Sequence, residues 1–529
     1  MQRKFLILFL LPVVFLTGCR KGFVGINTDP NLITAQQINF NYLFTNAQLQ
    51  TAGNTDGNGF EDWRNNLIYS GCIVQHLSST LPYWDGDKYL YNATYNSAYW
   101  DKNYPNSIAN ITAVIEQAKT DSSQFNLHQI ARIFRVFMFQ RMTDMYGDCP
   151  YSEAGKGYIS GITSPSYDRQ ENIYADMFNE LQDAASLLDP SRPNTIGQAD
   201  LLYGGAISAW KKFAYSEMVR LAMRLSKVDP ANAQKWVNIA VQGGVMNSYT
   251  DNAVLQHQNV TGTPVVNGTG LILVGNDPDG YRLSQTLVDF LRQSADPRLP
   301  YLATVCSNPS LPSDKGDTIA AHQVGQPNGY DPPNSETPYD LINAPGWPDI
   351  PQVGTPDSSD VYQNRYSVVN RYTFARLDAP TFFLTCGETL LLLAEAAQRG
   401  WISGDPSAYY SQGVEAAMQQ LTQAGAGPSG SVITTWLSWH PYDGTLQQIN
   451  TQYWVAGFMD ENECFANWRR SGYPLLKAVN YPGNVTGGTI PRRFTYPQDE
   501  ASTNTSNYNS AVSRLSGGDK MTSRVWWDK

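Results

Sequence analysis

The segment from Tyr83 to Tyr91 combines residue types that bind sugars. It reads Tyr-Trp-Asp-Gly-Asp-Lys-Tyr-Leu-Tyr and follows a proline, so aromatic rings and carboxylates alternate in a turn. Phenol and indole rings offer apolar faces for the C–H face of a sugar, while Asp oxygens accept hydrogen bonds from its hydroxyls. The alternative is that these rings pack in the core. We predict a ligand-binding surface made of Tyr83, Trp84, Asp85, Tyr89 and Tyr91, with Trp347 from a later loop.

The chain lacks the residue patterns of an enzyme. Its five histidines, His76, His128, His257, His322 and His440, are all far apart in the sequence. There is no His-Glu-x-x-His, no Gly-x-Ser-x-Gly and no phosphate-binding Gly-rich loop. A lone histidine such as His76 is ordinarily a core residue. We predict no catalytic residues, and a surface glycoside hydrolase with paired carboxylates remains the alternative.

Nothing in the sequence requires a metal or a cofactor. Besides Cys19, the cysteines are dispersed and form no Cys-x-x-Cys, so we expect buried free thiols rather than a disulfide framework. They are Cys72, Cys149, Cys306, Cys386 and Cys464. Asp277 and Asp279 could bind calcium, but Asp-rich turns are ordinarily only solvated. We predict no cofactor.

Composition excludes one class of partner. The 529 residues carry a net charge of −10, and no run of Lys and Arg interrupts the sequence. Nucleic-acid binding depends on neutralising phosphates, so we expect no nucleic-acid partner. Charged residues are only 16% and aromatic residues reach 12%, a balance that suits a surface for neutral polar ligands outside the cell.

The N-terminus predicts export and lipidation. Arg3 and Lys4 precede the apolar run Phe5–Leu16, which ends in Leu-Thr-Gly-Cys. This is the pattern of a signal peptide over residues 1–18, and a cysteine at the cut is typical of a bacterial lipoprotein. The run is shorter than the roughly 20 residues of a membrane-spanning helix. We expect acyl chains on Cys19, a tether over 19–31, and contact with the membrane by this anchor only.

The rest of the chain, residues 32–529, reads as one mainly α-helical domain. Apolar residues recur with helical spacing over Ile173–Leu188 and Leu201–Leu225, and again over Gly387–Gly400 and Pro406–Leu421. A short connection separates the two helices of each pair, so we predict antiparallel pairs that resemble tetratricopeptide repeats. Loop-rich insertions at about 251–282 and 307–366 are long enough to form a functional surface.

Short motifs in a fixed order resemble one family. They are Ile26–Asn31, Tyr146–Ala154, Trp210–Phe213, Arg220–Arg224, Asp296–Leu299, Leu393–Gly400, Trp468–Pro474, Pro491–Pro497 and Trp526–Asp528. With the lipidation signal they span nearly the whole chain, which resembles the SusD/RagB outer-membrane lipoproteins, in their SusD-like branch.

The resemblance implies a fold, a partner and a role. It implies a tetratricopeptide-like scaffold with ligand-binding loops, docked on a SusC-type TonB-dependent outer-membrane barrel, and no catalysis. SusD-like members capture glycans for import, whereas the RagB branch is associated with peptides, and both ligands stay open here. Display on the cell exterior follows from the family alone, because Arg20 and Lys21 stand where related lipoproteins often have acidic residues.

The arginines of the C-terminal motifs are expected to be structural. Arg469 and Arg470 follow Trp468, and Arg492 and Arg493 precede Tyr496. Guanidinium groups stack on rings and form bidentate pairs with carboxylates. We predict that they pair with carboxylates such as Glu388, Glu395 or Glu500 and hold the C-terminal segment on the helices.

Overall fold

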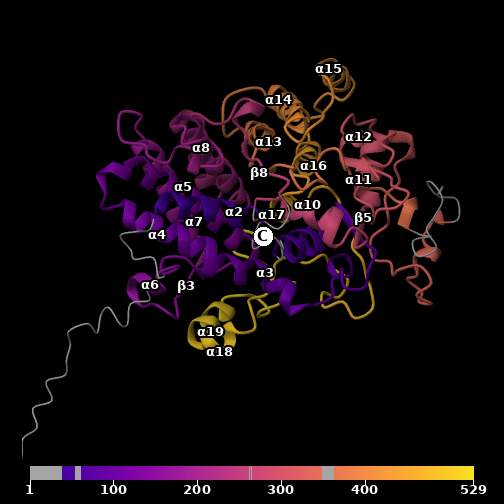
Figure 1. Ribbon diagram of the computed structural model, residues 1–529, viewed down its shortest axis with the longest axis horizontal. Helices are drawn as coiled ribbons and strands as arrows, with labels where there is room; N and C mark the ends of the chain where they lie inside the picture. The colour runs from indigo at the N-terminus through magenta and orange to yellow at the C-terminus, as the bar shows by residue number, and fades with distance from the viewer. Residues whose placement is uncertain (1–38, 54–60, 261–262, 264, 348–362) are drawn as a thin grey trace, which may run out of the picture. The chain divides into compact units, whose positions relative to one another are not determined.

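The computed structural model describes residues 39–53, 61–260, 263, 265–347 and 363–529 (Figure 1). The chain divides into two compact units, Met1–Phe40 and Asn41–Lys529. The predicted signal peptide, Cys19 and the tether over 19–31 lie outside the described residues. Across the described ranges, no helix is long and apolar enough to span a bilayer.

The elements of the second unit confirm the mainly α-helical prediction. The helices are α2 Phe40–Thr51, α3 Ala93–Asn103, α4 Ala109–Ala118, α5 Phe125–Tyr146, α6 Gly157–Ser160, α7 Gln170–Leu187, α8 Ile207–Arg224, α9 Pro230–Gly243, α10 Gly268–Leu271, α11 Gln285–Gln293, α12 Leu299–Leu302, α13 Cys386–Gln398, α14 Pro406–Gln419, α15 Gly430–Trp439, α16 Leu446–Ala456, α17 Glu461–Ser471, α18 Glu500–Thr503 and α19 Thr505–Ser513. A π-helical turn, η1, covers Asp62–Gly71.

The strands are short and pair two by two. They are β1 Leu77–Ser79, β2 Cys149–Pro150, β3 Tyr167–Asp168, β4 Ala253–Leu255, β5 Tyr281–Leu283, β6 Ala303–Thr304, β7 Val368–Val369 and β8 Thr381–Leu384. The antiparallel partners are β1 with β5, β2 with β3, β4 with β8 and β6 with β7. These ladders fasten loops to the helical scaffold and form no larger sheet.

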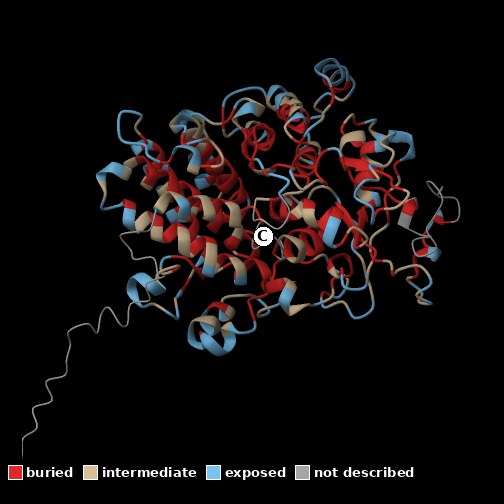
Figure 2. Ribbon diagram, in the orientation of Figure 1, coloured by how far each residue is buried: buried red, intermediate tan, exposed pale blue. Residues whose placement is uncertain are grey.

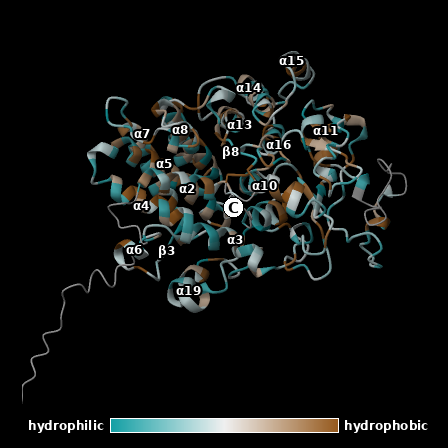
Figure 3. Cartoon of the chain, viewed as in Figure 1, coloured by the Kyte–Doolittle hydropathy of each residue, from teal (hydrophilic) through white to brown (hydrophobic). Residues whose placement is uncertain are grey.

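Consecutive helices pack against each other as predicted. The contacts join α7 with α8, α8 with α9, and α13 with α14, and the long helix α5 packs on both α4 and α7. Buried residues gather on these helices (Figure 2), which carry both hydrophobic and hydrophilic residues (Figure 3). The tetratricopeptide-like pairing thus follows from the amphipathic pattern of each helix.

Local signals in the sequence set the ends of α13 and α14. Thr385 and Glu388 form a capping box at the start of α13, since each side chain bonds the other residue's backbone N–H. Gly400 has a φ of +72° after the last turn, and Asp405 caps α14 just before Pro406. The turn between the helices is therefore encoded on both sides.

Three of the four motif arginines pair with carboxylates, although not all with the expected ones. Arg469 instead donates to the Arg492 carbonyl at 3.0 Å, and its guanidinium lies over the rings of Phe465 and Trp527. Arg470 donates to both oxygens of Glu395 at 2.7 and 2.8 Å, as predicted. Arg492 pairs instead with Asp528, and Arg493 with Asp519.

Two of the carboxylates proposed for these arginines have other partners. Glu388 lies 3.3 Å from Arg220, and Glu500 accepts from the Tyr167 hydroxyl at 2.7 Å. The prediction of a locked C-terminal segment is confirmed, while the assignment of its partners was wrong because Asp519 and Asp528 lie closer once the chain end folds back.

Candidate functional site

The predicted aromatic surface is only partly exposed. Tyr83 and Tyr91 have exposed fractions of 40% and 39%, as expected for a ligand face. Trp84 and Tyr89 are buried at 0% and 1%, and Trp347 at 8%. The expected exposure of these three rings was therefore wrong, because each one packs into the structure and offers no open face to a sugar.

Trp84 is buried because a distant carboxylate binds its indole. Its Nε1 donates to Asp277 Oδ2 at 2.5 Å, and its ring stacks on Tyr281 with centroids 5.9 Å apart. Asp277 also accepts from Trp63 Nε1 at 3.0 Å and from the Tyr83 hydroxyl at 2.7 Å. Three aromatic side chains thus donate hydrogen bonds to the carboxylate of Asp277, which the sequence analysis considered as a calcium ligand.

The middle of the segment supports a neighbouring loop. Asp87 accepts from Ser79 Oγ at 2.8 Å and from the backbone N–H of Gly329 at 3.1 Å. Lys88, only 2% exposed, lies 3.1 Å from Asp331 Oδ1. Charges this far from water are stable only when paired and hydrogen-bonded, so these contacts fix the position of the loop that contains Gly329 and Asp331.

Asp85 and Tyr89 complete this support. Asp85 is half-buried, and burial raises its carboxyl pKa to about 6. The Tyr89 hydroxyl accepts from the Val479 N–H at 3.3 Å, and its carbonyl accepts from the Val485 N–H at 3.1 Å. The segment Tyr83–Tyr91 therefore contacts and stabilises two loops, one before Tyr339 and one around residues 477–485.

Between those two loops lies a groove of about 390 Å³. Its lining residues are mostly uncharged: the carboxamides Gln75, Gln285, Asn328 and Asn480, the hydroxyl side chains Thr286, Tyr330 and Tyr339, the prolines Pro327, Pro338 and Pro345, and Gly329, Ala478 and Val479, with Lys477 as the charged member. Apolar walls with a few placed polar groups are typical of small-ligand sites.

The floor of the groove is rigid. Gln75 Nε2 donates to the Lys477 carbonyl at 2.5 Å, and its Oε1 accepts from Thr286 Oγ1 at 2.7 Å. Asn328 Nδ2 donates to the Leu77 carbonyl at 2.7 Å. These amides link the groove to β1 and α11, so the site is formed before any ligand arrives.

The tyrosines form the wall. Tyr339 packs against Tyr481 with centroids 5.0 Å apart, and the Tyr481 hydroxyl donates to Asp331 at 2.8 Å. Within the described part of the chain, the Tyr330 hydroxyl and the Gln285 side-chain carboxamide make no hydrogen bond to another residue, while the Gln285 backbone N–H donates to the Gln326 carbonyl at 2.8 Å. These two groups are thus available to a polar ligand.

Trp347 supports the groove from beneath. It forms a buried cluster with Leu341, Ala344 and Tyr366, against which Tyr330 packs. The centroids of Trp347 and Tyr366 are 6.1 Å apart. The predicted residue therefore positions a groove tyrosine and does not line the groove.

The sequence interpretation missed most of the lining. Gln75 and Gln285 lie beside strands, and single carboxamides in such places carry no distinctive signal. Tyr330 and Tyr339 did carry one, because aromatic residues in a loop rich in Pro, Gly and Asn are unusual for a disordered segment.

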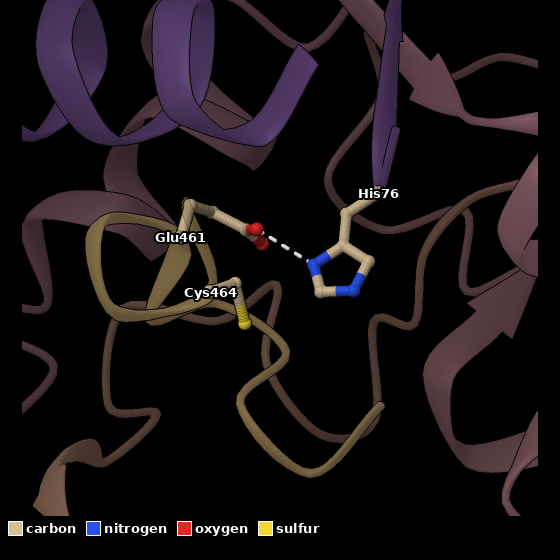
Figure 4. Close-up of side chains that lie close together, drawn as sticks. All are labelled: His76, Glu461 and Cys464. Atoms are coloured by element: carbon tan, nitrogen blue, oxygen red, sulfur yellow. Dashed lines mark hydrogen bonds and ion pairs between the residues drawn. The ribbon is translucent and has the colours of Figure 1, made fainter. Parts of the chain in front are cut away.

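A second group of side chains could bind a metal by type. His76, Glu461 and Cys464 offer ligand atoms within 4.8 Å of one another, and all three are buried (Figure 4). His76 Nδ1 lies 2.6 Å from Glu461 Oε2, and the imidazole packs against Trp454. The Cys464 thiol donates to the Trp454 carbonyl at 3.6 Å. His76 is a buried core residue, as predicted.

Known proteins share this architecture. The family model SusD-like_2, described as starch-binding and associating with the outer membrane, matches residues 30–497. No curated protein matches the chain. A solved chitin-binding protein is 33% identical, with a TM-score of 0.78, and the match covers 93% of this chain and 100% of that one.

Further solved structures agree. A Bacteroidetes SusD-like protein, AC2a, is 29% identical with a TM-score of 0.80, again over 93% and 100% of the two chains. A SusD-like protein from Bacteroides thetaiotaomicron VPI-5482, 22% identical over 93% and 99%, has the same fold with a TM-score of 0.71. Since the family model covers most of the sequence, the chain belongs to the SusD/RagB family, in its SusD-like branch.

Proposed function

We propose that this chain is a non-catalytic surface lipoprotein that binds an oligosaccharide or polysaccharide and delivers it to a SusC-type TonB-dependent barrel. Cys19 would carry the lipid anchor, with the domain on the outer face of the outer membrane. The observation that carries the proposal is the preformed groove, whose tyrosines, prolines and carboxamides match the apolar faces and hydroxyls of a sugar chain.

The ligand class follows from the same lining and from the relatives. No carboxylate lines the groove among the described residues, which suits neutral sugars with many hydroxyl or amide groups. A relative is named for chitin binding and the family for starch binding. These two neutral polysaccharides are the first ligands to test. Binding needs no metal, so EDTA should leave it unchanged.

The test is a binding measurement with residues 20–529, which contain the whole described domain. Titration calorimetry with chitohexaose, maltohexaose and a peptide library should give saturable binding to one glycan. Tyr339→Ala should lower that affinity by about tenfold, or roughly 1.4 kcal/mol, and Tyr339→Phe should lower it less. Tyr158→Ala is the matched control, because Tyr158 is fully exposed on α6, and it contributes to no contact of the groove.

Other outcomes would replace the proposal. Binding of peptides alone would favour the RagB-like function. Release of reducing ends from a polysaccharide by the purified chain would establish a glycoside hydrolase. Unchanged glycan affinity in Tyr339→Ala would remove the groove as the site.

A further inference from the structure

A second hollow is lined by the later part of the segment around residues 477–498, at Val485, Thr495, Tyr496 and Gln498. It has a volume of about 280 Å³ and shares no lining residue with the groove. Three tyrosines from distant parts of the chain line it: Tyr91, Tyr496 and Tyr508, the last on α19 (Figure 1). A hollow of this size has room for one or two sugar rings, and not for a long chain.

The rings are arranged as a floor and two walls. Tyr496 forms the buried floor: at 2% exposed it offers no ring face to a sugar, and its hydroxyl donates to the Asp148 carbonyl at 2.8 Å. Tyr508 stands edge-on to it, with centroids 6.0 Å apart and planes at 74°. Tyr91 is 39% exposed. Tyr91 and the half-buried Tyr508 are therefore the rings whose face or edge can contact one sugar ring.

Several polar groups in the hollow make no hydrogen bond or only a long one. Thr495 is 6% exposed, and its Oγ1 has no hydrogen-bond partner among the described residues. Gln498 Nε2 lies 3.4 Å from the Tyr91 hydroxyl, and the Tyr508 hydroxyl lies 3.3 Å from Asp519 Oδ2, both at the long limit of a hydrogen bond. A ligand hydroxyl bound in the hollow would satisfy this Thr495 hydroxyl.

The walls are held firmly by the C-terminal motif. The Thr495 N–H donates to Asn96 Oδ1 at 3.1 Å, and Arg493 donates to the Tyr146 carbonyl at 2.9 Å. Arg493 also pairs with Asp519 and lies 4.6 Å from the Tyr496 ring centroid. Asp519 is therefore neutralised by a buried partner and acts as a fixed acceptor rather than as a free charge.

We propose that this hollow is a second binding site for a single neutral sugar unit, which acts together with the groove on one glycan chain. Tyr89 connects the two sites, since it hydrogen-bonds Val479 at the groove and Val485 at the hollow. The inference rests on the proposed function. Two linked sites raise the affinity for a long chain without a new contact in either site, because the second binding event is intramolecular.

The experiment compares short and long ligands on residues 20–529. The glycan that binds in the first screen is used as its disaccharide and its hexasaccharide. Tyr508→Ala should lower hexasaccharide affinity by about tenfold and leave disaccharide binding in the groove unchanged. Thr495→Val removes only the unpartnered hydroxyl, so it should keep the melting temperature and still weaken the hexasaccharide by about threefold. Tyr158→Ala again serves as the control.

The outcomes separate the two proposals. Saturation-transfer contacts from a sugar to Tyr91 and Tyr508 that persist in Tyr339→Ala would support the second site. Hexasaccharide affinity that is unchanged in both Tyr508→Ala and Thr495→Val, but lost in Tyr339→Ala, would overturn it and leave the groove intact. Absence of glycan binding by the unmodified chain would overturn the proposed function itself.

Discussion

Lys88 Nζ lies 3.1 Å from Asp331 Oδ1, and the two side chains are 2% and 10% exposed. This buried pair joins the aromatic segment after β1 to the loop that carries Tyr330 and Tyr339. The candidate groove therefore depends on a pair that does not line it. The Tyr481 hydroxyl donates to the same Asp331 oxygen at 2.8 Å, so this carboxylate has a second partner.

Lys88→Met should destabilise the loop of the groove locally, more than it destabilises the rest of the domain. Removal of one partner leaves the other as an uncompensated buried charge, which costs about 3 kcal/mol. We expect faster amide hydrogen exchange at Gly329–Leu341 and weaker glycan binding. Arg376→Met is the control, since its pair with Asp378 is exposed and is worth less than about 1 kcal/mol.

A double variant checks the reason for this loss. Lys88→Met with Asp331→Asn removes both charges, so stability should return in part relative to Lys88→Met. A double variant as unstable as the single one would show that the aliphatic stem of Lys88, and not its charge, holds the loop.

Trp84→Phe should reduce stability and leave ligand affinity unchanged. The substitution keeps a large ring against Tyr281 but removes the donor to Asp277, which costs about 1–3 kcal/mol for a buried hydrogen bond to a charged group. Urea unfolding and titration with the bound glycan measure the two effects separately. A fall in glycan affinity with unchanged stability would show instead that Trp84 contacts the ligand.

How far the sequence predicts this structure differs between the scaffold and the site. The ends of α13 and α14 are local, because Thr385 and Glu388 cap each other within one turn. The burial of Trp84 is not local, because it depends on Asp277, which is 193 positions away. An alternating run of aromatic and acidic residues fits a sugar surface and a hydrogen-bonded core equally well, and only long-range pairing decides between them.

Part of the predicted ligand surface lies next to the candidate groove and not in it. Two of the predicted ligand residues support the groove: Tyr89 bonds Val479, and Trp347 belongs to the cluster against which Tyr330 packs. Tyr83 and Trp84 bond Asp277 instead, and Tyr91 lines the second hollow. The amides Gln75 and Gln285 could not be predicted, since their roles arise only where β1 and α11 meet the loop of Lys477.

Glu217→Gln should stabilise the chain above pH 7. Burial raises the pKa of this carboxyl to about 7, against 4.5 in the unfolded chain, although Arg220 lies 3.5 Å away. A raised carboxyl pKa means that the folded state binds the proton longer, so stability is lost as the pH rises from 4.5 through 7. Thermal unfolding should show a gain over the parent at pH 8 and little difference at pH 4.

Glu395→Gln should have the opposite pH dependence. Burial alone would raise the pKa of Glu395, but its pair with Arg470 prevails and lowers it to about 2. Its contribution to stability is present above pH 4.5 and is lost as the pH falls toward 2. The variant should thus be less stable than the parent at pH 7, and the gap should narrow by pH 3. Equal gaps at both values would show that packing, and not charge, governs this site.

The thiols of the folded domain should be unreactive. Cys72, Cys149, Cys306, Cys386 and Cys464 are all buried and unpaired, and burial raises the thiol pKa of Cys306 to about 11 and of Cys386 to about 12. Since only the thiolate reacts, a disulfide reagent at pH 8 should label none of them in the native chain and all five after denaturation. Labelling of Cys306 alone in the native state would mark local opening of the loop after β6, the partner strand of β7, and would place the flexible part of the domain there.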